Sequence, residues 1–118
     1  MVIKTGRKVA YQDFRGGRGT VYITWFVEEP PYEKSPIRKI ALVELPPGSS
    51  IGFHIHDGTE EIYYILSGKG IYTDGDREIE VSDGTVTITP SGTGHAIKNP
   101  GPDTLKLLAV INGVEYPR

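Results

Sequence analysis

The chain contains no cysteine among its 118 residues. Disulfide bonds, zinc–thiolate sites and cysteine nucleophiles are therefore excluded. No apolar run approaches the roughly 20 residues that a membrane-spanning helix needs. The first residues, Met1–Arg7, contain no apolar run of signal-peptide length either. We therefore expect a cytoplasmic protein that has no membrane partner.

An excess of positive charge is also missing, because the formal net charge is −2. The chain thus lacks the basic surface that nucleic acid requires, and we predict no nucleic-acid partner. One basic cluster, Arg15-Gly-Gly-Arg18-Gly, faintly resembles an RNA-binding repeat. It occurs once, so we interpret it as a flexible N-terminal loop. No helix-turn-helix pattern is visible, which argues against a self-contained transcriptional regulator.

Long helical patterns are absent as well. The 15 glycines and nine prolines interrupt the chain before any helical apolar period lasts three turns. The intervening segments are rich in Val, Ile, Thr and Tyr, which favour strands. We predict strands at Thr20–Glu28, Ile37–Leu45, Ser50–His56, Glu61–Ser67, Gly70–Thr73, Arg77–Val81, Thr85–Thr89, His95–Lys98 and Thr104–Ile111.

Turn signals separate these strands. Asp74-Gly75-Asp76 predicts a hairpin, and Pro46-Pro47-Gly48 and Ser82-Asp83-Gly84 predict chain reversals. Many short strands with closely spaced turns indicate an all-β antiparallel sandwich or barrel. We predict one domain over residues 18–118, preceded by an N-terminal arm, residues 1–17. The arm would pair with an edge of the barrel or with another subunit.

The three histidines all fall in two short segments of the chain. His54 and His56 are two positions apart on a predicted strand, so their side chains share one face. Glu61 opens the next strand, and an antiparallel return across a short turn would bring it beside them. Only a tertiary fold can add His95. Three imidazoles and one carboxylate are a common ligand set for a divalent transition metal.

Neighbouring strand residues face opposite ways, so only one of Glu60 and Glu61 can point toward the histidines. We choose Glu61, which puts Tyr63 on the same face as a candidate substrate-binding or outer-shell residue. The alternative for any single histidine is a packed, hydrogen-bonded side chain without a metal. The glycines of both segments are expected to shape turns.

The two segments resemble the two sequence motifs of the cupin superfamily. The first motif, G-x5-H-x-H-x3,4-E-x6-G, is filled by Gly48, His54, His56, Glu61 and Gly68. The second motif, G-x5-P-x-G-x2-H-x3-N, is filled by Gly84, Pro90, Gly92, His95 and Asn99. Every fixed position matches, which makes the resemblance specific for both fold and metal site.

The resemblance implies a double-stranded β-helix, or jelly-roll, barrel that holds one divalent metal at His54, His56, Glu61 and His95. Manganese, Mn(II), is favoured, while Fe(II), Ni(II), Co(II), Cu(II) and Zn(II) stay open. A homodimer and a small, anionic ligand are also implied. The chain looks most like small single-domain cupins that are often called oxalate decarboxylases.

The decarboxylase machinery itself does not carry over. Oxalate decarboxylases have two cupin domains and an arginine three residues before the first ligand histidine, where this chain has Ile51. Their catalytic glutamate lies beyond the second motif, where this chain offers only Glu115. We assign no catalytic residues.

Our first hypothesis is a metalloenzyme acting on a small polar metabolite, such as a carboxylate or a sugar-derived acid. Its reaction class, whether decarboxylase, dioxygenase or isomerase, stays open. The alternative is a non-catalytic module that binds or senses a small ligand. A purely structural metal site is a third option.

Overall fold

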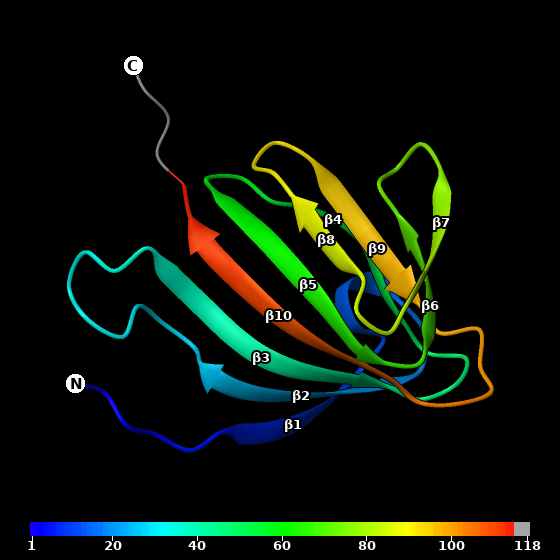
Figure 1. Cartoon of the computed structure of the whole chain (residues 1–118), viewed down its shortest axis with the longest axis horizontal. Helices are drawn as coiled ribbons and strands as arrows, with labels where there is room; N and C mark the ends of the chain where they lie inside the picture. Colours follow the sequence, from blue (N-terminus) through cyan, green and yellow to red (C-terminus); the bar gives the residue numbers. More distant parts are fainter. Residues whose placement is uncertain (115–118) are drawn as a thin grey trace.

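The computed structural model describes residues 1–114 and consists almost entirely of strands (Figure 1). One short 3-10 turn, η1 (Phe14–Gly16), follows the first strand. The strands are β1 (Arg7–Gln12), β2 (Thr20–Val27), β3 (Ile37–Leu45), β4 (Ser50–Ile55), β5 (Thr59–Ser67), β6 (Lys69–Thr73), β7 (Glu78–Ser82), β8 (Val86–Thr89), β9 (Gly94–Lys98) and β10 (Leu105–Gly113). No helix within residues 1–114 is long and apolar enough to cross a membrane.

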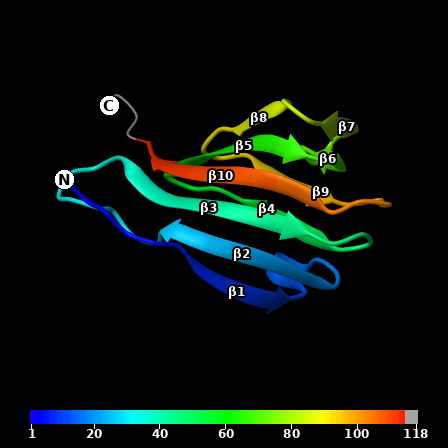
Figure 2. The ribbon, with the colours of Figure 1, turned by 60° about the horizontal axis from the view of Figure 1, so that its bottom comes forward.

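Two antiparallel sheets make up the fold. The six-stranded sheet has the order β1-β2-β3-β10-β5-β8, and the four-stranded sheet has the order β4-β9-β6-β7. Figure 2 shows the larger sheet as a twisted layer with β1 at one edge. Within residues 1–114 hydrogen bonds do not close the two sheets into a continuous barrel. Their facing surfaces instead share one apolar core, which is the jelly-roll arrangement that the motifs predict.

Strict alternation along the strands produces this core. On β5, Tyr63 and Ile65 are buried while Tyr64 and Leu66 are exposed. The same period places apolar side chains of β3 and β10 inside, including Leu107, which is fully buried. Burying a side chain of this size contributes about 1.5–3 kcal/mol. The inward face of β5 is therefore fixed, and every residue two positions along it points toward the interior.

The predicted strands are all present, and no end differs from its prediction by more than two residues. The predicted Asp74-Gly75-Asp76 turn joins β6 to β7 as a hairpin. Strand β1 was not predicted. It lies in the expected N-terminal arm and pairs antiparallel with β2. Only Val9 and Tyr11 of β1 are partly buried, so its apolar signal is too short to read.

Our prediction of how the chain brings Glu61 to the histidines is wrong. We expected the chain to return beside β4 as an antiparallel partner, but β4 pairs with β9 and β5 pairs with β8 and β10. The turn after His56 carries the chain from one sheet to the other. Glu61 therefore faces the histidines across the interior rather than along a shared ladder.

The cluster interpreted as a flexible loop is hydrogen-bonded to β4. The backbone N–H of Ser50 donates to the Arg18 carbonyl at 2.9 Å, and the Arg18 N–H donates to Ser50 Oγ at 2.9 Å. The segment containing η1 is thus attached to the smaller sheet.

Candidate metal centre

Three elements bring the four predicted ligands together. His54 on β4 stands directly opposite His95 on β9 in the strand register. His56 follows the last residue of β4, and Glu61 projects from β5 in the opposing sheet. One ligand atom from each of the four lies within 4.8 Å of all the others. Glu60 points away from this cluster, and its carboxylate lies 3.5 Å from the Asn112 amide nitrogen.

The spacing of the four atoms suits a metal ion. Nε2 of His95 lies 3.2 Å from Nε2 of both His54 and His56. Oε1 of Glu61 lies 2.8 Å from His95 Nε2, 3.0 Å from His56 Nε2 and 3.7 Å from His54 Nε2. Metal–nitrogen bonds of about 2.1 Å meeting at roughly 90–110° separate neighbouring ligand atoms by roughly 3.0–3.4 Å. The cluster therefore fits the donor geometry of a divalent metal.

The remaining ring nitrogens orient the imidazoles. Nδ1 of His54 lies 2.8 Å from the Gly52 carbonyl, which can only accept, so Nδ1 carries the proton and Nε2 presents a lone pair to the interior. His95 Nδ1 lies 2.8 Å from Thr89 Oγ1, which in turn lies 2.7 Å from the Tyr72 hydroxyl. Such outer contacts fix the ring orientation of metal-binding histidines.

The charge state of the site follows from burial and hydrogen bonding. Burial alone would raise the pKa of Glu61, but the close contacts of its carboxylate with the imidazoles of His54, His56 and His95 hold that pKa far below its ordinary value. Burial also lowers the pKa of His95, against the opposing effect of Glu61. The charged form of Glu61 and the neutral form of His95 are the forms in which these groups bind a metal.

Tyr63 lies on the same inward face as Glu61, as its position two residues along the strand requires. Its ring stacks on that of His95, with centroids 4.8 Å apart and planes 24° apart. Burial, followed by the negative charge of Glu61, raises the pKa of the Tyr63 phenol well above its ordinary value. The phenol therefore stays protonated and can donate a hydrogen bond into the interior.

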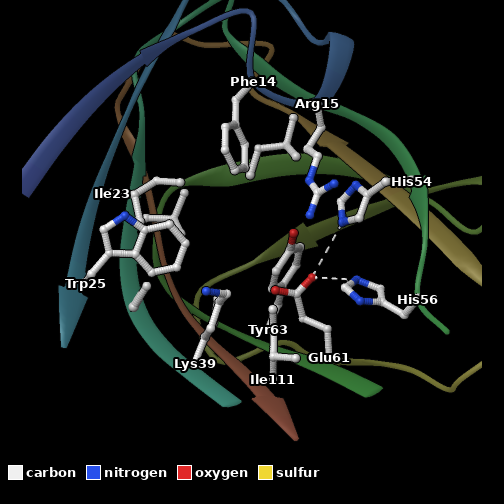
Figure 3. Close-up of a pocket in the computed structure, with 14 residues that line it drawn as sticks. Phe14, Arg15, Ile23, Trp25, Lys39, His54, His56, Glu61, Tyr63 and Ile111 are labelled. Carbon is white, nitrogen blue, oxygen red and sulfur yellow. Dashed lines mark hydrogen bonds and ion pairs between the residues drawn. The ribbon is translucent and has the colours of Figure 1, made fainter. Parts of the chain in front are cut away.

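A cavity of about 80 Å3 opens beside the cluster. Figure 3 shows His54, His56, Glu61 and Tyr63 along one side of it. A cavity needs roughly 10–15 Å3 to hold a single water, so this space suits a molecule of a few heavy atoms. Most of the other walls are apolar, with lining residues that include Ile23, Trp25, Val43, Ile51 and Ala109.

Two cations that the sequence did not assign to the site also line this cavity, Arg15 and Lys39. Lys39 Nζ donates to the Glu28 carbonyl at 2.9 Å and lies 5.2 Å from the Trp25 ring centroid. Arg15 reaches in from η1, far from both motifs (Figure 3). Nothing in the local sequence pattern marks either residue, because each is brought in by tertiary contacts.

Comparisons with known proteins agree with this geometry. A family model described as a cupin domain matches residues 41–111. The oxalate-binding protein of Thermotoga maritima is 42% identical over 100 residues, which cover 84% of this chain and 81% of that protein. An uncharacterized protein of Methanocaldococcus jannaschii is 38% identical over 79 residues, 67% of this chain and 63% of that protein.

Solved structures give the same result. The crystal structure of a predicted oxalate decarboxylase from Thermotoga maritima matches with a TM-score of 0.87 and 37% identity, covering 97% of this chain and 100% of that one. The residues matched by the cupin-domain model, 41–111, include all four clustered residues. With its two sheets, its complete pair of motifs and its His–Glu cluster, the chain belongs to the cupin family.

Proposed function

We propose that this protein binds one divalent transition metal through His54, His56, Glu61 and His95, and that it binds a small carboxylate at the positions of the metal left open. The observation that carries the proposal is the convergence of four ligand atoms at the wall of a small cavity. The name of the Thermotoga relative, oxalate-binding protein, supports oxalate or a similar small carboxylate as the ligand.

Coordination chemistry supports an anionic ligand. Four protein ligands leave one or two positions free on a five- or six-coordinate ion, and an open position distinguishes a ligand-binding metal from a closed structural one. A hard carboxylate oxygen can occupy such a position directly. The cavity of about 80 Å3 limits the ligand to a small molecule, which favours a compact acid over a whole sugar.

Mn(II) is our first choice of metal, on the resemblance to the family. The donor set contains nitrogen and oxygen and no sulfur, which suits Mn(II) or Fe(II) as well as Co(II), Ni(II), Cu(II) and Zn(II). Elemental analysis of the purified protein identifies the metal that it carries. Metal content near one atom per chain is expected.

Binding without turnover is the function that the cavity supports best. Among its described lining residues, Glu61 is the one carboxylate, and the two imidazoles present are those of His54 and His56. A carboxylate or imidazole separate from the metal ligands, the commonest kind of catalytic base, is therefore missing from this lining. A metalloenzyme is the second candidate, favoured by the protonated Tyr63 phenol, which lines the cavity and could give a hydrogen bond to a substrate.

Calorimetric titration of the manganese-loaded protein with oxalate tests the proposal. We expect saturable binding that disappears after chelation of the metal and in His54→Ala. Analysis of the same mixtures for carbon dioxide, formate and oxygen consumption separates the two candidates. Product formation by the loaded protein would favour the enzyme, whereas absence of oxalate binding by the loaded protein would reject the carboxylate proposal.

A homodimer is the assembly that we propose. The outer surface of β5 and β8 carries four exposed apolar side chains, Tyr64, Leu66, Val86 and Ile88, which are 42%, 44%, 53% and 61% exposed. Tyr64 pairs with Val86 across the two strands, so these residues form one continuous patch. Contiguous apolar patches of this kind favour self-association. The cytoplasmic location stays a prediction.

Light scattering after gel filtration tests the dimer. Ile88→Lys is expected to give a monomer, because it puts a charge on the most exposed side chain of the patch. Ile79→Lys is the matched control, since Ile79 is also exposed but lies on β7 in the other sheet. A monomeric wild-type protein, or a dimer that both variants leave intact, would contradict this interface.

A further inference from the structure

A guanidinium, that of Arg15, lines the cavity beside the candidate metal ligands. Arg15 lines the cavity together with His54 and Tyr63. In Figure 3 its side chain descends from η1 and directs its nitrogens toward the His54 ring and the Tyr63 hydroxyl. We propose that Arg15 binds the part of a dicarboxylate that the metal does not hold, and so sets specificity for a dianion. The inference rests on the proposed function.

The donors of Arg15 are available for a ligand. Within residues 1–114 no carboxylate forms an ion pair with Arg15, and its residue as a whole is exposed. The Arg15 Cζ lies 6.0 Å from the centroid of the Phe14 ring. The other cation of the cavity differs, because the Lys39 ammonium is already hydrogen-bonded to the Glu28 carbonyl.

The chemistry of the guanidinium matches this ligand. Its planar fork can donate two parallel hydrogen bonds to one carboxylate, a geometry that a lysine ammonium cannot reproduce. The strand that carries the first histidines supplies no cation of its own, since Ile51 on β4 is 3% exposed and belongs to the core. Arg15 provides a guanidinium from a segment that is far from both motifs in the sequence but packs against β4.

The backbone holds Arg15 in an unusual conformation. Its φ of 55° and ψ of 31° lie in the left-handed region, which a residue with a side chain seldom adopts. Asp13, two residues earlier, also has a positive φ, of 52°. Such strain persists only where surrounding contacts impose it, and it gathers at ligand-binding sites.

Two glycines impose those contacts. A Cβ added to Gly52 on β4 would lie 2.2 Å from the Arg15 carbonyl oxygen, and one added to Gly17 would lie 2.1 Å from the Ser50 carbonyl oxygen. The two backbones are therefore in direct contact, and only glycine permits this approach. The contact lays η1 across β4 next to the histidines.

Aromatic packing fixes the other side of the segment. The Phe14 ring lies 4.9 Å from that of Tyr11, and the Trp25 indole N–H donates to the Tyr11 hydroxyl at 2.8 Å. Phe14 and Trp25 pack against the main core. Arg15 thus extends from a segment that is attached to both sheets, so the position of its backbone beside the cavity is set before a ligand arrives.

Calorimetry on the manganese-loaded protein tests this proposal, with oxalate as the dianion and glycolate as a monoanionic chelator. Arg15→Gln is expected to raise the Kd for oxalate about 10- to 100-fold, the loss typical of a charge-assisted hydrogen bond. The rise for glycolate should be smaller. Arg15→Lys should fall between wild type and Arg15→Gln. Arg18→Gln is the matched control, because it removes the same charge from the same segment and should leave both constants unchanged.

Metal content is measured in every variant. Equal manganese in wild type and Arg15→Gln, with weaker oxalate binding in the latter alone, supports the inference. Equal oxalate affinity in Arg15→Gln and Arg18→Gln overturns it while the proposed function stands. Loss of manganese in Arg15→Gln also overturns it, because Arg15 would then support the metal centre. A loaded wild-type protein that binds no oxalate rejects the proposed function itself.

Discussion

The metal centre and the η1 segment meet at one cavity, yet they are built in different ways. The four clustered residues depend on strand register, because His54 and His95 are direct partners on β4 and β9. Arg15 depends on a close backbone approach at Gly17 and Gly52. One pocket can therefore combine two kinds of sequence requirement. The metal centre needs particular side chains at fixed positions, whereas the placement of Arg15 needs glycine, with no side chain, at positions 17 and 52.

The largest effect is expected from a substitution in the metal centre itself. Glu61→Gln removes the charge of the cluster, so metal affinity should fall by more than about 100-fold, the upper end of what outer-shell changes cost. Glu60→Gln is the matched control, because Glu60 is adjacent in sequence and faces Asn112. Elemental analysis after dialysis measures both. Equal metal content in the two variants would contradict the assignment of Glu61.

A smaller effect is expected one layer out. Thr89→Val keeps the shape of the side chain but removes the contacts of Oγ1 with His95 Nδ1 and the Tyr72 hydroxyl. Metal affinity should fall about 10- to 100-fold, because the imidazole loses its orienting partner. Competition with a fluorescent chelator measures the change. Unchanged affinity would show that stacking on Tyr63 alone orients His95.

The contact between the η1 segment and β4 can be disrupted by a substitution that leaves the metal ligands intact. Gly17→Ala places a Cβ against the Ser50 carbonyl, which should cost about 1–3 kcal/mol of unfolding free energy. Oxalate binding should weaken as in Arg15→Gln while metal binding persists. Gly16→Ala is the control: its φ is +79° but open space surrounds the site, so a loss of about 1 kcal/mol is expected. Urea denaturation and calorimetry distinguish the two.

The smallest effect is expected at Thr87, which can be compared with Thr89 on the same strand. Thr87 is two residues from Thr89 on β8, and within residues 1–114 its buried Oγ1 has no hydrogen-bond partner. Thr87→Val removes this unpaired group and should raise the unfolding free energy by about 1 kcal/mol. Metal affinity should not change. A destabilised Thr87→Val would mean that the hydroxyl has a partner, such as a bound water.

Much of the fold could be predicted, because alternation and turn residues are local signals. Ile37–Leu45 has both, and β3 begins and ends where the pattern does. The four clustered residues were also predictable, since the spacing of the two motifs is specific. The sequence could not predict which sheet contains β5. The turn at Asp57-Gly58 permits either a hairpin with β4 or a crossing to the other sheet.

Strand β1 and the role of Arg15 were missed for a related reason. β1 lies at a sheet edge with little buried apolar surface, so the alternation that marks other strands is faint. Arg15 stands in a glycine-rich sequence whose composition is typical of loops. Its position comes from contacts with Gly52, 37 residues away, and no local pattern contains that information.

The placement of Glu61 in one sheet and of the histidines with the other has a mechanical consequence. A metal held by all four would be a strong crosslink between two layers that otherwise meet through apolar packing and hydrogen bonds such as those of Thr89. Chelation would remove that crosslink and let the smaller sheet open separately from the larger one. Amide exchange in β4 and β9 would then accelerate more than in β2 and β3, so occupancy of the site would be reported by the rigidity of one sheet.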